Sequence, residues 1–298
     1  MKEERDRAES LQRIAGREIE MRPHSRELIE AFLPIMVARE RLLERLGQSR
    51  RAPVAVDGVR FLVGVSLAAQ QNLYDREDPW QEVALAVVSA VREGFPGLRA
   101  DMERLEAALG SGRVAPYDGL VSDAREAQAA VAAWAEALPM APRRIGFVLG
   151  QIKRVILHRR RRENEASLKT AAWRKGYCPV CGAFPSLAVI RKQGGQRWLH
   201  CSQCGQDWPF SRVICPYCEC EGQEGMTLFY VEQSDRESVF ACDKCKRYLI
   251  TLNHTADWYD FDPDLAAIGL AHLDLIMQEK GFSPMAVCDW NVFQEGEG

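Results

Sequence analysis

The residues best suited to chemistry in this chain are its cysteines. Eight of the ten form four pairs with two residues between the partners, and the pairs are Cys178 and Cys181, Cys201 and Cys204, Cys215 and Cys218, and Cys242 and Cys245. Such a pair points both thiolates at one metal ion, and two pairs complete a tetrahedral site with bonds of about 2.3 Å for zinc. The spacing therefore predicts two tetrahedral four-cysteine ions per chain, and sulfur ligands suit iron as well as zinc.

The order of the pairs along the chain favours sequential pairing. The second pair begins after a gap of 19 residues from Cys181, which fits the spacing typical of a zinc site, and 23 residues separate Cys218 from Cys242. We therefore assign Cys178, Cys181, Cys201 and Cys204 to one site and Cys215, Cys218, Cys242 and Cys245 to the other. A cross-braced arrangement, in which the first pair shares an ion with the third, stays open.

Three further residues near these motifs have open roles. Cys220 is an extra thiol between the third and fourth pairs, and it is a spare cysteine, an alternate ligand or a reactive thiol. Cys288 is best interpreted as a small apolar filler. His200 precedes Cys201, and because four cysteines are already present we expect it to support a ligand or simply to fill its strand.

The segments between the cysteine pairs must position them. Residues 187–193 and 196–200 have strand-like composition and flank Gly194-Gly195, which predicts a hairpin. Residues 227–232 and 238–241 repeat this plan around a polar turn at 234–237. Two tandem zinc-ribbon or rubredoxin-like modules follow, related by internal duplication. The two ribbon segments have few large apolar residues and cannot form a stable hydrophobic core by themselves. We therefore expect the metals to be mainly structural, with metal binding supplying about 10–16 kcal/mol of folding free energy per site.

The cysteine-free half has the pattern of a helical bundle. Apolar residues recur at helical spacing over 26–47, 57–72, 80–94, 98–109, 122–137 and 143–160. Pro34 is expected to kink or divide the first of these helices. A last helix is predicted over 263–280, capped by Asp262 and closed by Gly281. Its apolar residues lie on nearly all sides of the helix, so we expect it to be buried against the N-terminal helical domain. The fold class is α+β, with domains at 1–172, 173–214, 215–256 and 257–298.

Charge and composition exclude several function classes. The net charge of −3 over 298 residues excludes a uniformly basic nucleic-acid binder, although residues 143–175 hold eleven basic and two acidic side chains. The run Arg159–Arg162 within that segment is a solvated helix end or an internal partner for the acidic residues 257–298. In the alternative, these two charged segments are docking features. The charged first residues indicate no signal peptide, no stretch is apolar enough to span a membrane, and no common catalytic motif is present. We therefore expect a cytoplasmic protein that is not an enzyme.

Beyond the cysteines, residues 177–282 contain a specific set of motifs. They are Cys178-Pro-Val-Cys181-Gly182, Arg197-Trp198-Leu199-His200-Cys201 with Cys204 and Trp208, Arg212 before Cys215 and Cys218, Cys242 and Cys245 with Lys246, Tyr248 and Leu249, Asp264-Leu265-Ala266, Leu273-Asp274 and Gly281-Phe282. In these motifs the sequence resembles the E-type formate dehydrogenase accessory (formation) protein family. The chain departs from the family pattern at Trp198, at the additional Cys220, and in its ending Cys288-Asp289-Trp290-Asn291.

The resemblance implies a cytoplasmic maturation factor that binds the catalytic subunit of formate dehydrogenase, the subunit that carries the molybdenum or tungsten cofactor. It also implies rubredoxin-like iron, which leaves open a redox-active metal or thiol protein acting on that subunit. A zinc-ribbon protein that binds nucleic acid is the other alternative, although we expect neither nucleic acid nor membrane as a partner.

Overall fold

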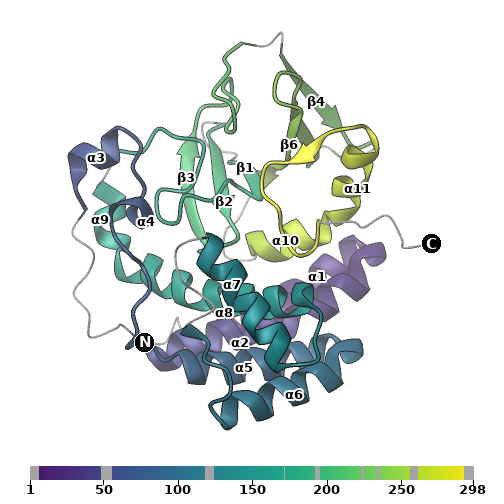
Figure 1. The fold of residues 1–298 in the computed structure, drawn as a ribbon. Coiled ribbons are helices and arrows are strands. Elements are labelled where there is room, and N and C mark those ends of the chain that lie inside the picture. The colour runs from purple at the N-terminus through teal and green to yellow at the C-terminus, as the bar shows by residue number, and fades with distance from the viewer. Residues whose placement is uncertain are drawn as a thin grey trace. The chain divides into compact units, whose positions relative to one another are not determined.

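The computed structural model describes residues 7–47, 56–117, 124–170, 172–191, 195–222, 225–232, 234, 236–255 and 261–291 (Figure 1). The chain divides into two compact units, each assembled from separate stretches of sequence. Unit 1 comprises Met1–Ala15, Ile29–Ala52 and Asn72–Glu163, and unit 2 comprises Gly16–Leu28, Pro53–Gln71 and Asn164–Gly298. The four domain ranges expected from the sequence stay a prediction.

Unit 1 is helical. Its elements are parts of α1 (Arg7–Met21) and α2 (Arg26–Leu46), followed by α5 (Trp80–Gly94), η3 (Pro96–Leu98), α6 (Arg99–Gly110), α7 (Ala124–Ala137) and α8 (Pro142–Glu163). Helix α5 packs against α6 and α8, and α7 packs against α8 (Figure 1). The core side of α8 buries Ile145, Val148, Ile152 and Val155, as the apolar spacing predicts.

Two details of unit 1 bear on the sequence predictions. Helix α2 continues through Pro34 without a break, so the proline does not divide it. The first two residues of the helix predicted over 122–137 lie outside the described residues, and the helix observed there is α7.

Unit 2 is built around one seven-stranded sheet. The strands are β1 (Leu187–Arg191), β2 (Arg197–Cys201), β3 (Gln206–Phe210), β4 (Met226–Tyr230), β5 (Glu237–Cys242), β6 (Arg247–Thr255) and β7 (Ser283–Pro284). Their order is β3-β2-β1-β6-β5-β4, with β7 beside β6 (Figure 1). The two ribbons are antiparallel meanders that join through a parallel pair, β1 and β6, in which Ala188 lies opposite Thr251. The predicted α+β class is confirmed, and the two ribbon modules share a single sheet.

The predicted hairpins are present, although parts of their turns are not described. Strands β1 and β2 pair antiparallel, and so do β4 and β5. Gly195 has a φ of 61°, which favours glycine, while its neighbour Gly194 lies outside the described residues. Asp235 of the second turn and residues 256–260 and 292–298 of the acidic end also lie outside them.

Two helices predicted from the sequence, over 57–72 and 263–280, are each replaced by two shorter helices in unit 2. The pattern over 57–72 forms two short helices, α3 (Gly58–Leu62) and α4 (Leu67–Gln70), because Gly64 between them has a φ of 94°. The remaining helices of unit 2 are η2 (Pro23–Ser25), α9 (Glu165–Thr170), α10 (Pro263–Gly269) and α11 (Ala271–Glu279).

The predicted C-terminal helix is interrupted between α10 and α11. The Ser25 hydroxyl donates a 2.7 Å hydrogen bond to the carbonyl of Gly269, so this oxygen is used by another segment, and the N–H of Leu273 bonds to Leu270 instead. Asp262 caps α10 as predicted, accepting from the N–H of Leu265. The C-terminal helices therefore contact the N-terminal segment 16–28 within unit 2.

Candidate metal centres

All four cysteine pairs adopt the same backbone turn. In each, the N–H of the residue after the second cysteine donates to the carbonyl of the first, at 2.8–3.0 Å. That following residue has a positive φ in every case, and the four residues are Gly182, Gly205, Glu219 and Lys246. The turn draws the two thiols of a pair to one side, which is the arrangement that a metal knuckle needs.

The first cluster brings together the four cysteines assigned to it. The sulfur of Cys178 lies 3.4 Å from that of Cys204, and the sulfur of Cys181 lies 3.5 Å from that of Cys201. All four sulfurs lie within 4.8 Å of one another. A tetrahedral ion with bonds of about 2.3 Å separates its ligands by about 3.8 Å. The donor set and its spacing therefore fit a zinc or iron ion.

The second cluster holds five sulfurs. The sulfurs of Cys215 and Cys245 are 3.8 Å apart, and those of Cys218 and Cys242 are 3.7 Å apart, as sequential pairing predicts. Cys220 also enters this cluster, since its sulfur lies 3.4 Å from that of Cys242. The arrangement in both clusters is the sequential one and not the cross-braced one. The sequence alone left the role of Cys220 open, and the structure places its sulfur among the ligands of the second cluster.

The electrostatics of both clusters favour a bound cation. Burial raises the pKa of the Cys178 and Cys204 thiols well above the ordinary value. In the second cluster burial raises the pKa of Cys245 to about 12. Burial acts in the same direction on Cys242, but hydrogen bonds from the Cys245 N–H and the Cys220 thiol lower its pKa to about 7. Several thiolates can share so small a volume only when a cation balances them, so metal binding must release protons.

His200 supports the first ribbon without contacting a thiol. Its Nδ1 lies 2.8 Å from Asp207 on β3, and its Nε2 lies 3.1 Å from Asp264 on α10. Burial lowers the pKa of His200, but the two carboxylates outweigh it and raise the pKa to about 10. The charged imidazole therefore ties β2 and β3 to the C-terminal helices.

A segment far away in sequence braces the first knuckle. The N–H groups of Leu67 and Ala68 on α4 donate to the carbonyls of Pro179 and Val180, both at 2.9 Å. These carbonyls belong to the residues between Cys178 and Cys181, so α4 fixes the turn that orients both thiols. Sequence reasoning missed this role because the contact joins positions more than a hundred residues apart.

The start of the first ribbon lies directly against the third knuckle. A Cβ added to Gly176 would meet the carbonyl oxygen of Pro216 at 1.9 Å, so only glycine fits this position. Pro216 lies between Cys215 and Cys218. The backbone before the first cluster therefore packs directly against the backbone of the second cluster.

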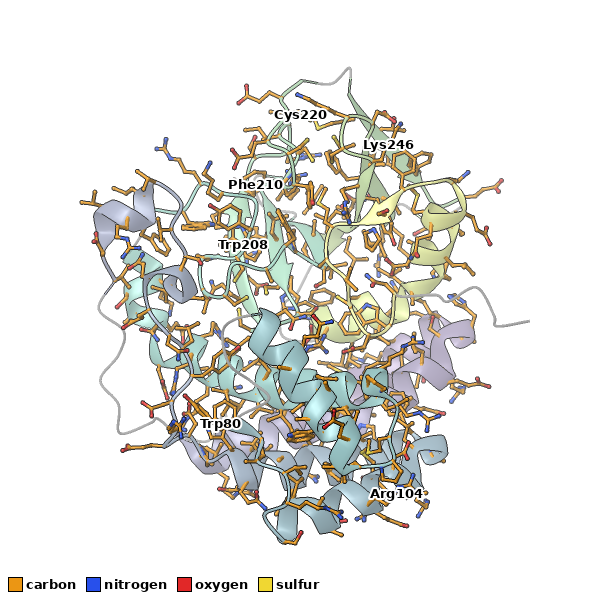
Figure 2. The ribbon with its side chains drawn as sticks, viewed as in Figure 1. Trp80, Arg104, Trp208, Phe210, Cys220 and Lys246 are labelled. Atoms are coloured by element: carbon orange, nitrogen blue, oxygen red, sulfur yellow. The ribbon has the colours of Figure 1, made fainter. Side chains whose placement is uncertain are left out.

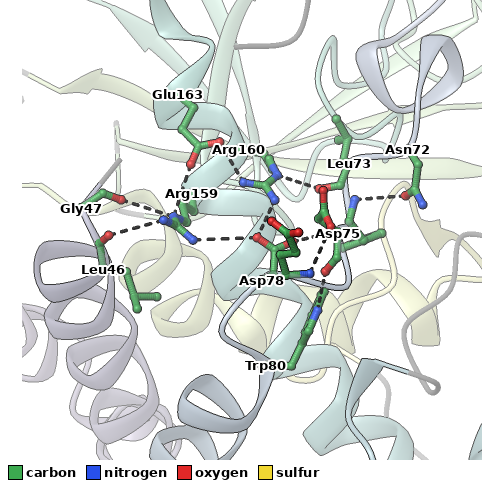
Figure 3. A network of polar contacts seen from close by, with 12 residues as sticks. Leu46, Gly47, Asn72, Leu73, Asp75, Asp78, Trp80, Arg159, Arg160 and Glu163 are labelled. Atoms are coloured by element: carbon green, nitrogen blue, oxygen red, sulfur yellow. Dashed lines mark hydrogen bonds and ion pairs between the residues drawn. The ribbon is translucent and has the colours of Figure 1, made fainter. Parts of the chain in front are cut away.

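The arginine run at the end of α8 is not a free basic patch. Arg160 is 1% exposed and donates to Asp78, to Glu163 and to the carbonyl of Leu73 (Figure 3). Arg159 lies 3.3 Å from Glu163, and Arg162 pairs with Glu40. The alternative of a docking feature at Arg159–Arg162 is corrected accordingly, since Arg159, Arg160 and Arg162 bind carboxylates within unit 1.

Cys288 lies apart from both clusters. It is buried, and its N–H donates to Asn291 at 2.8 Å. This position fits the predicted role as a small apolar filler.

In the part of the chain that the structure describes, no helix is long and apolar enough to cross a membrane.

Comparison with known proteins points to one family. The model of the FdhE central domain matches residues 177–212, which include the first cluster. The chain is 35% identical over 113 residues to a Protein FdhE homolog of Aquifex aeolicus, covering 37% of this chain and 40% of that protein. It is 33% identical over 130 residues to Protein FdhE of Escherichia coli strain K12, covering 41% of this chain and 39% of that protein. The matched region thus spans about two fifths of these relatives.

A solved structure shares the fold over nearly the whole chain. The crystal structure of the FdhE protein from Pseudomonas aeruginosa superposes with a TM-score of 0.58 and 19% identity, covering 97% of this chain and 95% of that one. At this identity the likeness is one of fold. Together with the sequence matches, it confirms the resemblance to the FdhE family.

Proposed function

From this resemblance to the FdhE family, we propose that the protein is a cytoplasmic assembly factor for a formate dehydrogenase. In this proposal it binds the catalytic subunit, which carries the molybdenum or tungsten cofactor, during maturation, and it is not itself an enzyme. The observation that carries the proposal is the coincidence of the family match at 177–212 with a four-sulfur cluster in the same residues.

We further propose that Cys178, Cys181, Cys201 and Cys204 bind one ion and that Cys215, Cys218, Cys242 and Cys245 bind a second. The fit of the donor atoms supports this assignment. When bound, zinc or iron supplies a divalent positive charge that holds the thiolates together. The chain's own contribution is the four identical knuckle turns, the α4 brace and the Gly176 contact, which orient the donors in the folded chain.

A mainly structural role for the ions agrees with the position of the clusters in the sheet. Strand β2 ends at Cys201 and β5 ends at Cys242, so each cluster terminates strands of the sheet. An ion at these ends joins the segments that carry the two knuckles of each ribbon. Metal binding then supplies folding free energy of about 10–16 kcal/mol per site.

Two alternatives from other classes receive different support. A redox-active thiol protein is favoured by the presence of a fifth thiol in the second cluster, where the sulfur of Cys220 lies 3.4 Å from that of Cys242. A nucleic-acid-binding ribbon protein was suggested mainly by the basic run Arg159–Arg162. This support is removed, because arginines of the run form ion pairs within unit 1. Retention on heparin that falls steeply with salt would be needed to revive it.

Affinity capture tests the proposal directly. The tagged full chain is expressed in cells that make formate dehydrogenase, and the captured proteins are identified by mass spectrometry. The catalytic subunit should be recovered with the full chain and not with the tag alone. Repeated failure to recover this subunit, with a folded and metal-loaded bait, overturns the proposed function.

A matched bait tests whether the first ribbon is required for this binding. The double variant Cys178→Ser and Cys181→Ser removes one knuckle and leaves unit 1 unchanged. Because the first ribbon should lose its ion and unfold, recovery of the subunit is expected to fall sharply. Unchanged recovery would show that the ribbon does not contribute to binding.

A further inference from the structure

The third knuckle carries an additional cysteine at a defined structural position. In the first knuckle the N–H of Cys178 donates to the carbonyl of Ala183 at 2.8 Å, and in the third the N–H of Cys215 donates to the carbonyl of Cys220 at 3.0 Å. The two acceptors each lie five residues after their donor. Cys220 therefore occupies in the second ribbon the position that Ala183 occupies in the first.

This position places the thiol inside the second cluster. The sulfurs of Cys215, Cys218, Cys220 and Cys242 all lie within 4.8 Å of one another. Cys245 borders the same group, with its sulfur 3.8 Å from that of Cys215. Figure 2 shows Cys220 at the same end of the sheet as Lys246, the residue that follows Cys245. Five thiols thus surround a site that a tetrahedral ion fills with four.

We propose that the second centre has five thiol donors, and that Cys220 and Cys245 alternate as the fourth ligand of one zinc or ferrous ion. In the exchange, one metal–sulfur bond forms from Cys220 as the bond to Cys245 breaks. The proton that leaves the Cys220 thiol is balanced by a proton taken up at Cys245 through solvent. No electron is transferred, and the ion keeps its charge. The inference rests on the proposed metal binding and not on the proposed partner.

The positions and burial of the five sulfurs together indicate which ligands exchange. Cys215 and Cys242 are buried, whereas Cys218, Cys220 and Cys245 are half-buried. Of these three, Cys245 is the one outside the group of four sulfurs that lie within 4.8 Å of one another, and Cys220 takes its place in that group. The segment around Cys220 is also held in place, since Glu219 donates from its N–H to Cys215 at 3.0 Å and Ile214 pairs with Glu221. The first cluster has no fifth sulfur among its described neighbours, because alanine stands at 183. We therefore expect the second ion to be released to a chelator faster than the first.

Alkylation of the intact, zinc-loaded chain tests the exchange without any substitution. The chain is treated with a limiting amount of N-ethylmaleimide, and the labelled cysteines are mapped by mass spectrometry. The label should divide between Cys220 and Cys245, while the other three cysteines of the cluster stay protected. Label on Cys220 alone, or on Cys245 alone, would show one fixed fourth ligand and overturn the proposal.

Substitutions provide a second test, read as bound zinc per chain. Cys220→Ser and Cys245→Ser should each keep both ions, and the double variant should keep only one. Cys204→Ser is the matched control, because the first ribbon has no spare thiol and should lose its ion. Loss of an ion from Cys245→Ser alone would contradict the exchange. A wild-type chain that binds no zinc at either centre would instead refute the metal assignment under the proposed function, and capture of the partner is measured separately.

Discussion

Arg160 is the clearest case of a single residue whose environment decides its role. Its guanidinium is buried with the carboxylates of Asp78 and Glu163 around it. Removing one member of a buried ion pair leaves the others uncompensated, at a cost of about 3–5 kcal/mol. Arg160→Leu should therefore lower the free energy of unfolding by about that amount in a denaturant titration. Arg143→Ala, at an exposed position of the same helix, is the control and should change it little.

Asp274 is a second residue with a measurable effect. It is buried, and it accepts a 2.6 Å hydrogen bond from the Tyr248 hydroxyl. Burial raises its pKa to about 7, against the lowering effect of the Tyr248 and Asn291 hydrogen bonds. The unfolded chain ionises this carboxyl near pH 4, while the folded chain holds its proton until about pH 7. Asp274 should therefore make folding less favourable as pH rises through this window, by about 3 kcal/mol between pH 5 and 8.

Asp274→Asn should remove this pH dependence, because the amide keeps a hydrogen-bond acceptor and carries no charge. The variant is expected to be more stable than the wild type at pH 8 and closer to it at pH 5. The measurement is the free energy of unfolding at both pH values. Equal pH slopes for the two proteins would show that Asp274 titrates normally in the folded state.

At the scale of the elements, the four knuckle turns are the repeated unit. Gly182 follows the first pair with a φ of 77°, and an added Cβ would lie 3.3 Å from the Ser66 hydroxyl. A left-handed conformation costs a non-glycine residue about 1–2 kcal/mol. Gly182→Ala should therefore destabilise the folded chain by about that amount and speed zinc release from the first ribbon. Lys246→Ala is the control, since Lys246 already carries a Cβ at a φ of 56°.

How far the sequence predicts these elements depends on the range of the interactions involved. The knuckles and their sequential pairing follow from ligand spacing, which is local, and α5 and α8 follow from helical periodicity. The pairing of β1 with β6, the α4 brace and the break at Gly269 depend on contacts between distant positions. No local pattern contains that information. Helix α1 was missed because charged residues dominate its sequence, although Leu11, Ile14 and Ala15 recur at helical spacing and are buried.

The arginine run and Cys220 show the same limit at single residues. Four consecutive arginines resemble a solvated surface, and the partner that buries Arg160 is Asp78, 82 positions earlier in the chain. Cys220 is recognisable from the sequence as an extra thiol, and its spacing from Cys215 indicates its place in the cluster. It lies five residues after Cys215, as Ala183 lies after Cys178. Aligning the two ribbons on their first cysteines would have found it.

For the whole molecule, the ions should stabilise one unit far more than the other. Removal of both ions by a chelator is expected to unfold the sheet of unit 2, because each site contributes about 10–16 kcal/mol. Hydrogen exchange should become fast in β1–β6, while amides of α5 and α8 in unit 1 keep their protection. Adding zinc back should restore the slow exchange of the strands. Slow exchange throughout the chelated chain would contradict a structural role for the metals.

The claim on which the account depends most is that one chain binds two tetrathiolate ions. Native mass spectrometry of the full chain, purified under reducing conditions, measures this directly. We expect a mass increase that corresponds to two ions of zinc or iron, and elemental analysis should give the same number. A single ion, or none together with disulfides inside the cysteine pairs, would contradict it.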